Sequence, residues 1–149
     1  MAWIYDYGVT ENTSATTGFT AELPEHDTND MLICFAAKDS TGAITYTAGT
    51  GWTALSSGAG GAQWVGAWYK RATSNAESAP AFTHGSEESN AIIVAVRGAH
   101  TSTAPTSVIS TDDTTMAGGG FLQDQSYTSP STNSIVLFGM GTDSGIGPA

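Results

Sequence analysis

The stretch Gln63-Trp64-Val65-Gly66-Ala67-Trp68-Tyr69-Lys70-Arg71 decides the fold class. Side chains two residues apart point to the same side of a β-strand, and large aromatic residues favour strands. Both alternate sets here are rich in apolar residues, which predicts a strand with both faces covered. One face would carry Trp64, Gly66, Trp68 and Lys70, and the other Val65, Ala67, Tyr69 and Arg71.

Further strands are predicted on both sides of this stretch. Continuous apolar runs at 31–37, 90–98 and 134–140 predict three buried strands, of which 134–140 is the last strong one. Alternation predicts an N-terminal strand over 1–8 and shorter strands at 18–24, 44–47 and 81–84. Polar or Gly/Ser-rich segments predict loops at 12–17, 56–61 and 74–80, the second of these as an exposed hairpin loop.

The fold class that follows is all-β. Short strands with turn signals between them, and the lack of a 3.6-residue apolar period, favour an antiparallel β-sandwich. We expect it to be jelly-roll-like, with long Gly/Ser/Thr loops. The 149 residues are enough for one domain, so 1–149 is taken as a single unit with a C-terminal tail at 141–149.

The charge balance excludes several kinds of partner. Four Lys and Arg residues against fourteen Asp and Glu give a net charge of −10, which argues against nucleic acid and against an anionic membrane surface. The N-terminus lacks a basic region followed by a long apolar one, so no secretory signal is predicted and synthesis in a cytoplasm is expected. Cys34, alone within an apolar run, is interpreted as a buried hydrophobic side chain.

Signals for catalysis are weak throughout the chain. The glycine spacing at 139–145 departs from a dinucleotide-binding loop, and the Asp143-Ser144-Gly145 tripeptide would need a second copy to form an aspartic protease site. His26, His84 and His100 are interpreted as loop residues. We therefore expect no enzyme and no cofactor. A weak structural Ca²⁺ site stays open at the oxygen-rich segments 26–30, 84–88 and 112–113.

The aromatic residues are the strongest candidates for a binding role. Trp64 and Trp68 would lie ~13 Å apart on one face by strand rise. An exposed face would make them, or Trp52, a platform for stacking sugars, whereas an inner face would make them core, which we favour. The alternation at the N-terminus would place Trp3, Tyr5 and Tyr7 on one side of a strand, as a candidate interface between subunits.

The order of several short motifs resembles a known group of proteins. These motifs are Leu23-Pro24 before Asp30–Phe35, Gly51-Trp52-Thr53, Ala67–Ala72, Phe82-Thr83, Ala91–Gly98 and Asn133–Phe138. Over residues 18–140 they resemble β-sandwich virion structural proteins of tailed bacteriophages, of the head-decoration or tail-fibre-like type.

The resemblance implies a non-enzymatic protein on the virion exterior, with capsid decoration first and a tail-fibre component second. It implies packing on the major capsid protein or other virion proteins, and a homo-oligomer, with a trimer favoured. Related chains continue past the last strand, so a sheet edge is expected to be completed by another subunit. The alternative function is a carbohydrate-binding, lectin-like module that stacks sugars, such as a host-surface glycan, on its Trp side chains.

Overall fold

The stretch that decides the fold class forms strand β5, Gln63–Arg71, with the bounds that its alternation predicts. The structure is a computed structural model. It describes residues 2–40, 42–46, 51–60 and 63–105, together with Ile135 and Leu137.

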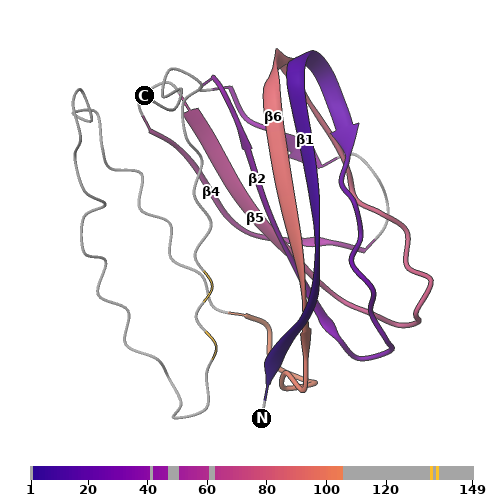
Figure 1. The fold of residues 1–149 in the computed structure, drawn as a ribbon. Helices are drawn as coiled ribbons and strands as arrows, with labels where there is room; N and C mark the ends of the chain where they lie inside the picture. The colour runs from indigo at the N-terminus through magenta and orange to yellow at the C-terminus, as the bar shows by residue number, and fades with distance from the viewer. Residues whose placement is uncertain are drawn as a thin grey trace, which may run out of the picture.

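Six strands make up the described part of the chain, which contains no helix (Figure 1). Neighbouring strands are antiparallel in the order β1-β6-β2-β5-β4, and β3 pairs with β6 outside this path. The predicted all-β, antiparallel class is therefore confirmed. The other strands are β1 Trp3–Thr20, β2 Met31–Lys38, β3 Thr45–Tyr46, β4 Thr53–Gly60 and β6 Ala81–Arg97.

The sandwich and the jelly-roll order remain predictions, because the described strands belong to one hydrogen-bonded sheet. The predicted strand at 134–140 lies outside the described residues except for Ile135 and Leu137, and so does the tail at 141–149. Within the described ranges, no helix has the length and apolar character needed to cross a membrane.

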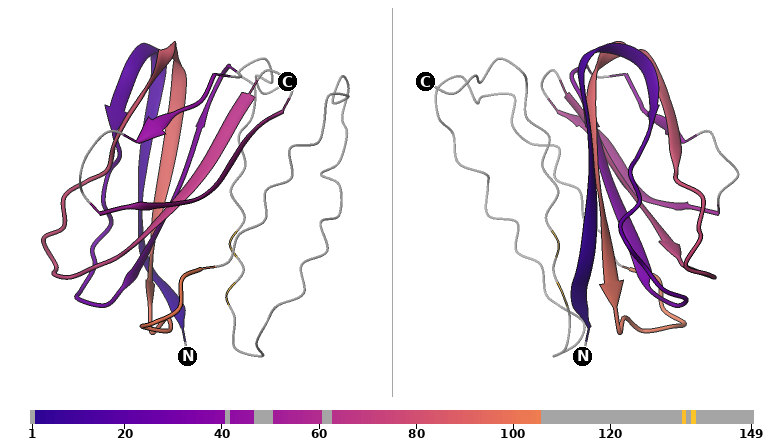
Figure 2. Two further views of the ribbon diagram at one scale, coloured as in Figure 1. Left: turned by 180° about the vertical axis from the view of Figure 1, so that it is seen from behind. Right: turned by 45° about the vertical axis from the view of Figure 1, so that its right-hand side comes forward.

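Strands β1 and β6 are longer than predicted, and together they bend over one end of the sheet (Figures 1 and 2). The predicted loop at 12–17 is part of β1, and the separate strands predicted at 81–84 and 90–98 are one strand. Irregularities in the β1–β6 register fall between Asn12 and Gly18. Bulges bend a strand pair, so β1 and β6 can change direction over these polar residues while they remain paired.

The strand β4 is a second correction. Residues 56–61 were predicted as an exposed hairpin loop, but Thr53–Gly60 pairs with β5 along its whole length. A Ser/Gly-rich composition is typical of a turn, yet an edge strand needs little side-chain packing when its backbone bonds are made by a neighbour.

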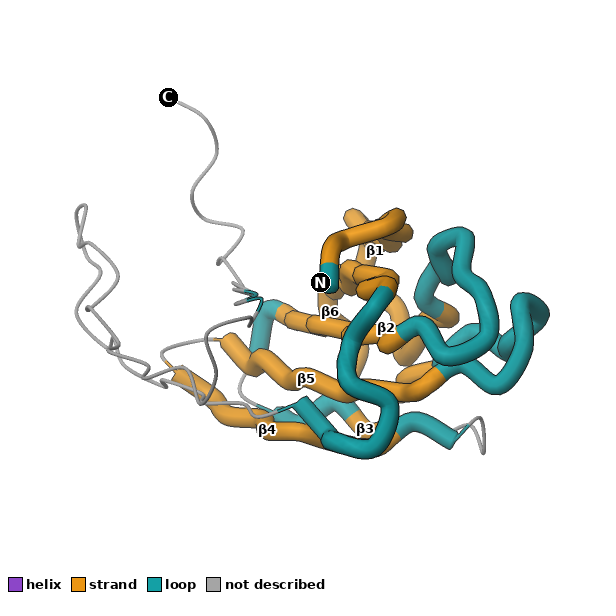
Figure 3. Tube along the Cα trace, turned by 90° about the horizontal axis from the view of Figure 1, so that it is seen from below, coloured by secondary structure: helices purple, strands orange, loops and turns teal. Residues whose placement is uncertain are grey.

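One face of the sheet, which we call the inner face, holds the main core. Cys34 of β2 lies between Trp68 of β5 and Ile93 of β6 in the register, and all three side chains are buried. The bent end of the β1–β6 pair brings Phe82 over this face, where its ring centroid is 4.9 Å from that of Trp68. Figure 3 shows the strands one after another across the sheet, from β1 through β6, β2 and β5 to β4.

The opposite face, the outer face, carries a second apolar cluster. Met31, Val94 and Val96 are buried there, and Ile33 and Tyr69 pack against them. This arrangement explains why β2 and the end of β6 read as continuous apolar runs, because each contributes side chains to both faces.

Gly66 is the position on which the inner face depends. Trp64 and Trp68 flank it on the same face, and their rings lean toward each other until their centroids are 5.9 Å apart. A Cβ at Gly66 would lie 2.5 Å from Cη2 of Trp64 and 2.6 Å from Cη2 of Trp68. A side chain here would therefore force two large buried rings to move at once.

We expect Gly66→Ala to lower the free energy of unfolding by about 1–3 kcal/mol, the usual cost of overpacking a core. The matched control is Gly85→Ala in β6, where an added Cβ meets nothing within 4 Å. The control should change stability by no more than about 0.5 kcal/mol. Urea unfolding measures both variants, and equal stabilities would contradict this account of the core.

Candidate functional site

The first candidate site is an apolar stripe on the outer face, which we call the β1 stripe. It consists of Ile4, Tyr7, Val9 and Ile92, whose exposed fractions are 50%, 62%, 42% and 36%. The register places Ile4 opposite Val96, Tyr7 opposite Val94, and Val9 opposite Ile92, so these side chains share one face. Four adjacent large apolar side chains exposed together mark an interaction surface more often than four scattered ones do.

The predicted grouping of Trp3, Tyr5 and Tyr7 is wrong in one respect. The register shifts between Ile4 and Asp6, and this places Tyr7 on the same face as Ile4. Tyr5 instead lies against Arg97, with the guanidinium carbon 3.7 Å from the ring centroid. All three predicted residues are exposed, at 50% for Trp3 and 42% for Tyr5, but they do not form a single row.

The inner side of β1 is covered by the segment that follows the strand. The amide of Glu22 donates to Oγ1 of Thr10, and the amide of Glu25 donates to Oδ2 of Asp6. Gly8 allows the close approach, because a Cβ there would lie 2.5 Å from the carbonyl oxygen of Glu22. The outer face and the edge of β1 therefore remain for contact with another molecule.

Among the described residues, β1 pairs with β6 alone and ends the strand order. An edge strand with exposed apolar side chains is a template for pairing with another chain, and proteins usually protect such edges. The outer cluster of Met31, Val94 and Val96 continues the β1 stripe inward, and Leu137 packs against that cluster.

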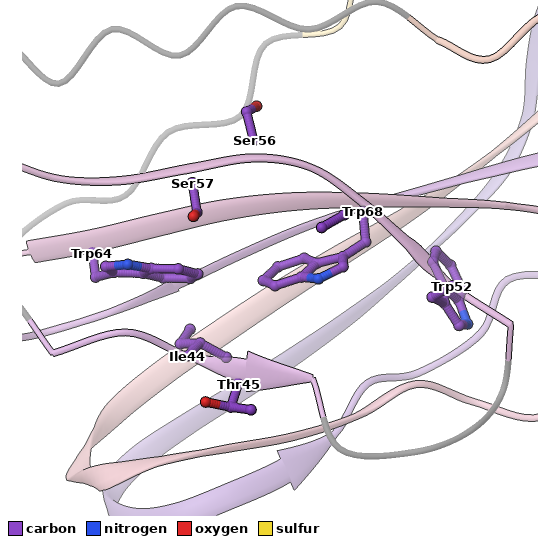
Figure 4. A pocket seen from close by; sticks show the side chains of 8 residues that line it. Ile44, Thr45, Trp52, Ser56, Ser57, Trp64 and Trp68 are labelled. Carbon is purple, nitrogen blue, oxygen red and sulfur yellow. The ribbon is translucent and has the colours of Figure 1, made fainter.

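The second candidate site is a cavity of about 440 Å³ on the inner side of β4 and β5 (Figure 4). Three indoles line it, those of Trp52, Trp64 and Trp68. Ile44 and Thr45 lie on the other side of the rings from β4, which contributes Ala54, Ser56 and Ser57. We call it the tryptophan cavity.

Trp64 and Trp68 belong to the core, as the favoured interpretation predicted. Their exposed fractions are 6% and 5%, and that of Trp52 is 7%, so none of them forms an exposed platform. Nε1 of Trp52 is buried and has no hydrogen-bond partner among the described residues, and the same holds for Oγ of Ser56. Buried polar atoms are usually paired, so an unpaired indole N–H beside a cavity is a donor available to a ligand.

One of the proposed cation sites is occupied by an arginine instead. Nε of Arg97 donates to Oδ1 of Asp30 at 3.1 Å, and Nη2 donates to Oδ2 of Asp30 at 2.8 Å and to Oδ2 of Asp27 at 2.7 Å. The two carboxylates that a Ca²⁺ ion would need in 26–30 are thus both hydrogen-bonded to one guanidinium. The described residues contain no group of three or more His, Cys, Asp and Glu side chains suited to a metal, and 112–113 lie outside them.

The remaining cysteine and histidine side chains lie in surroundings that indicate a structural role. Burial raises the pKa of the Cys34 thiol to about 12, which leaves it protonated and unreactive at neutral pH. Nδ1 of His26 is 2.7 Å from the carbonyl oxygen of Pro24, and Nδ1 of His84 is 2.6 Å from that of Gly85. His100 lies in an exposed turn, beside the hydroxyls of Ser102 and Thr103.

Sequence reasoning missed parts of both sites. Val9 and Ile92 were not singled out, because their exposure depends on β1 being an edge strand and on its register with β6. The sequence does not identify Ser57 and Thr45 as cavity residues, in the case of Ser57 because the Ser/Gly-rich run at 56–61 indicates a loop. The short run Ile44–Thr47 was the one available signal for the far wall of the cavity.

Comparison with protein-family models, with curated proteins and with solved structures finds no match to this chain. The two sites are therefore interpreted from their residues and geometry.

The Arg97–Asp30 pair leads to a prediction about acid stability. Hydrogen bonds from Arg97 hold the pKa of the buried Asp30 carboxyl below its ordinary value of 3.8. A carboxyl with a lowered pKa stabilises the fold above the unfolded value, and this stabilisation is lost as the pH falls through the folded value. The stability of the wild type should therefore decrease below about pH 4.

We expect Asp30→Asn to lower the free energy of unfolding at pH 7 by about 1–3 kcal/mol, the usual loss for a hydrogen bond to a charged group. The variant should also lose part of the acid dependence. Urea unfolding between pH 7 and pH 3 measures this, with the exposed Glu25→Gln as the control. An Asp30→Asn variant whose stability falls with acid as steeply as that of the wild type would refute this role.

Proposed function

We propose that this chain is a non-enzymatic structural subunit that assembles with other copies of itself through the β1 stripe and the edge of β1. The observation that carries the proposal is the exposure of Ile4, Tyr7 and Val9 on β1, which ends the strand order of the described sheet. Covering such side chains gains roughly 25 cal/mol for each Å² of apolar surface removed from water.

A stable contact needs more surface than these side chains alone provide. Specific interfaces bury about 800 Å² on each partner. Trp3 and Tyr5, both exposed near the start of β1, would extend the contact beyond the β1 stripe. Aromatic residues are enriched at interfaces because they bury a large area with few rotatable bonds.

The net charge of the chain affects the association between copies. Each copy carries −10, so association between copies works against electrostatic repulsion. The side chains of the β1 stripe are uncharged, and salt screens the repulsion between the remaining surfaces. Self-association is therefore expected to strengthen as salt is added, the opposite of a contact held by ion pairs.

The setting that we propose follows from the sequence resemblance. It is the exterior of a bacteriophage particle, with capsid decoration first, on the major capsid protein, and a tail-fibre component second. A trimer is the favoured assembly. Neutral Ser, Thr and Gly surfaces suit packing by shape and hydrogen bonds. Cryo-electron microscopy of particles with and without this chain would locate it, and particles lacking any density for it would contradict this setting.

We also propose that the complete fold is a jelly-roll-like sandwich. The support is Leu137, which packs on the outer-face cluster of Met31, Val94 and Val96. An apolar outer face is normally covered by a second layer, as in sandwiches whose two sheets share a core.

The test of the assembly proposal is the substitution Tyr7→Lys. Placing a charge in the β1 stripe should convert an oligomer into a monomer, because a buried unpaired ammonium is costly. The matched control is Ser14→Lys, which adds the same charge at another exposed position of β1. Sedimentation equilibrium measures the mass of each variant, and circular dichroism verifies that both are folded.

Two outcomes would contradict the proposal. In one, the wild type is a monomer at every concentration and salt level tested. In the other, Tyr7→Lys and Ser14→Lys have the same mass as an oligomeric wild type, which would place the interface elsewhere.

A further inference from the structure

We propose that the tryptophan cavity binds a neutral sugar ring, such as the terminal unit of a glycan. This function is separate from assembly, because the cavity lies on the inner side of β4 and β5, whereas the β1 stripe lies on the outer face at the opposite edge of the sheet. A volume of about 440 Å³ falls within the usual range for small-molecule sites, roughly 300–1,000 Å³.

The lining combines the two kinds of group that a sugar ring needs. The indoles of Trp52, Trp64 and Trp68, each 5–7% exposed, provide the apolar part of the lining. Figure 4 shows the Ser57 hydroxyl directed from β4 toward the rings of Trp64 and Trp68, with Thr45 on their far side. Hydroxyls on two sides of an aromatic layer can donate to and accept from the hydroxyls of a sugar.

Trp52 supplies an independent observation that points to a ligand. Its side chain is more than nine-tenths buried, and its Nε1 donor has no partner in the described part of the chain. Leaving such a donor unpaired is energetically unfavourable. A sugar oxygen in the cavity would accept this hydrogen bond and recover part of that cost.

The lining favours a sugar over other occupants. A quaternary ammonium ion is often held by an aromatic cage, but the described residues that line this cavity include no carboxylate. An entirely apolar ligand would leave Ser57, Thr45 and the Trp52 donor without partners. A neutral sugar ring would contact the indoles through its C–H groups, and its hydroxyls would pair with the polar groups of the lining.

The experiment is a nuclear magnetic resonance titration of the ¹⁵N-labelled full chain with methyl glycosides of glucose, galactose, mannose and N-acetylglucosamine. The four Trp residues give four indole N–H signals. We expect at least one glycoside to shift the Trp52 signal in a saturable way and to leave the signal of the exposed Trp3 unchanged.

Trp52→Phe keeps an aromatic ring and removes the unpaired N–H. This variant should bind the same glycoside at least about tenfold more weakly, since one hydrogen bond of about 1.4 kcal/mol corresponds to a factor of ten. The matched control is Tyr69→Phe, which also keeps an aromatic ring and removes one polar group, but on the outer face and away from the cavity. It should bind as the wild type does. Signal dispersion shows that both variants are folded.

Three results would overturn the proposal. The first is the absence of any indole shift with all four glycosides. The second is a shift at Trp3 alone, which would place binding near the start of β1. The third is a saturable shift with free indole or with choline but with none of the glycosides, which would assign the cavity to an apolar or a cationic ligand.

Discussion

The packing of two indoles over a residue without a side chain is the constraint on which the rest of the structure depends. Trp64 and Trp68 meet above Gly66, and Phe82 contacts Trp68 from the bent end of the β1–β6 pair. The same two indoles line the tryptophan cavity. A smaller pair of side chains would leave empty space that the surrounding elements fill only in part.

The two faces of the sheet have different roles because of this packing. The inner face is filled by aromatic rings and by small residues such as Ala91 and Ala95, so its surface is largely used within the chain. The outer face is buried at its centre and exposed toward β1. The proposed assembly at the outer face and the proposed ligand binding at the inner face therefore involve different residues.

Strands with strong local patterns could be predicted from the sequence. Strand β5 was predicted with its observed bounds, and β2 to within one residue. Short stretches of alternating aromatic residues or of continuous apolar residues are compatible with few structures other than a strand. Strand β4 was missed because its Ser and Gly residues have no intrinsic preference for a strand and become one only by pairing with β5.

The β1 stripe was harder to predict, for a different reason. A one-residue bulge near Tyr5 changes which side chains share a face, and nothing in an alternating sequence marks such a bulge. The exposure of Val9 follows from the place of β1 at the end of the strand order, which depends on contacts between distant parts of the chain. Trp64 and Trp68 were placed correctly because both faces of their strand are apolar.

The central claim is that the outer face and edge of β1 are covered by a second copy of the chain. Amide hydrogen exchange of the wild type, compared at low and high protein concentration, tests it most directly. The account predicts that protection rises with concentration in β1 and remains constant in β2 and β5, which lie inside the sheet. Exchange in β1 that is independent of concentration, in a sample shown to be oligomeric, would contradict it.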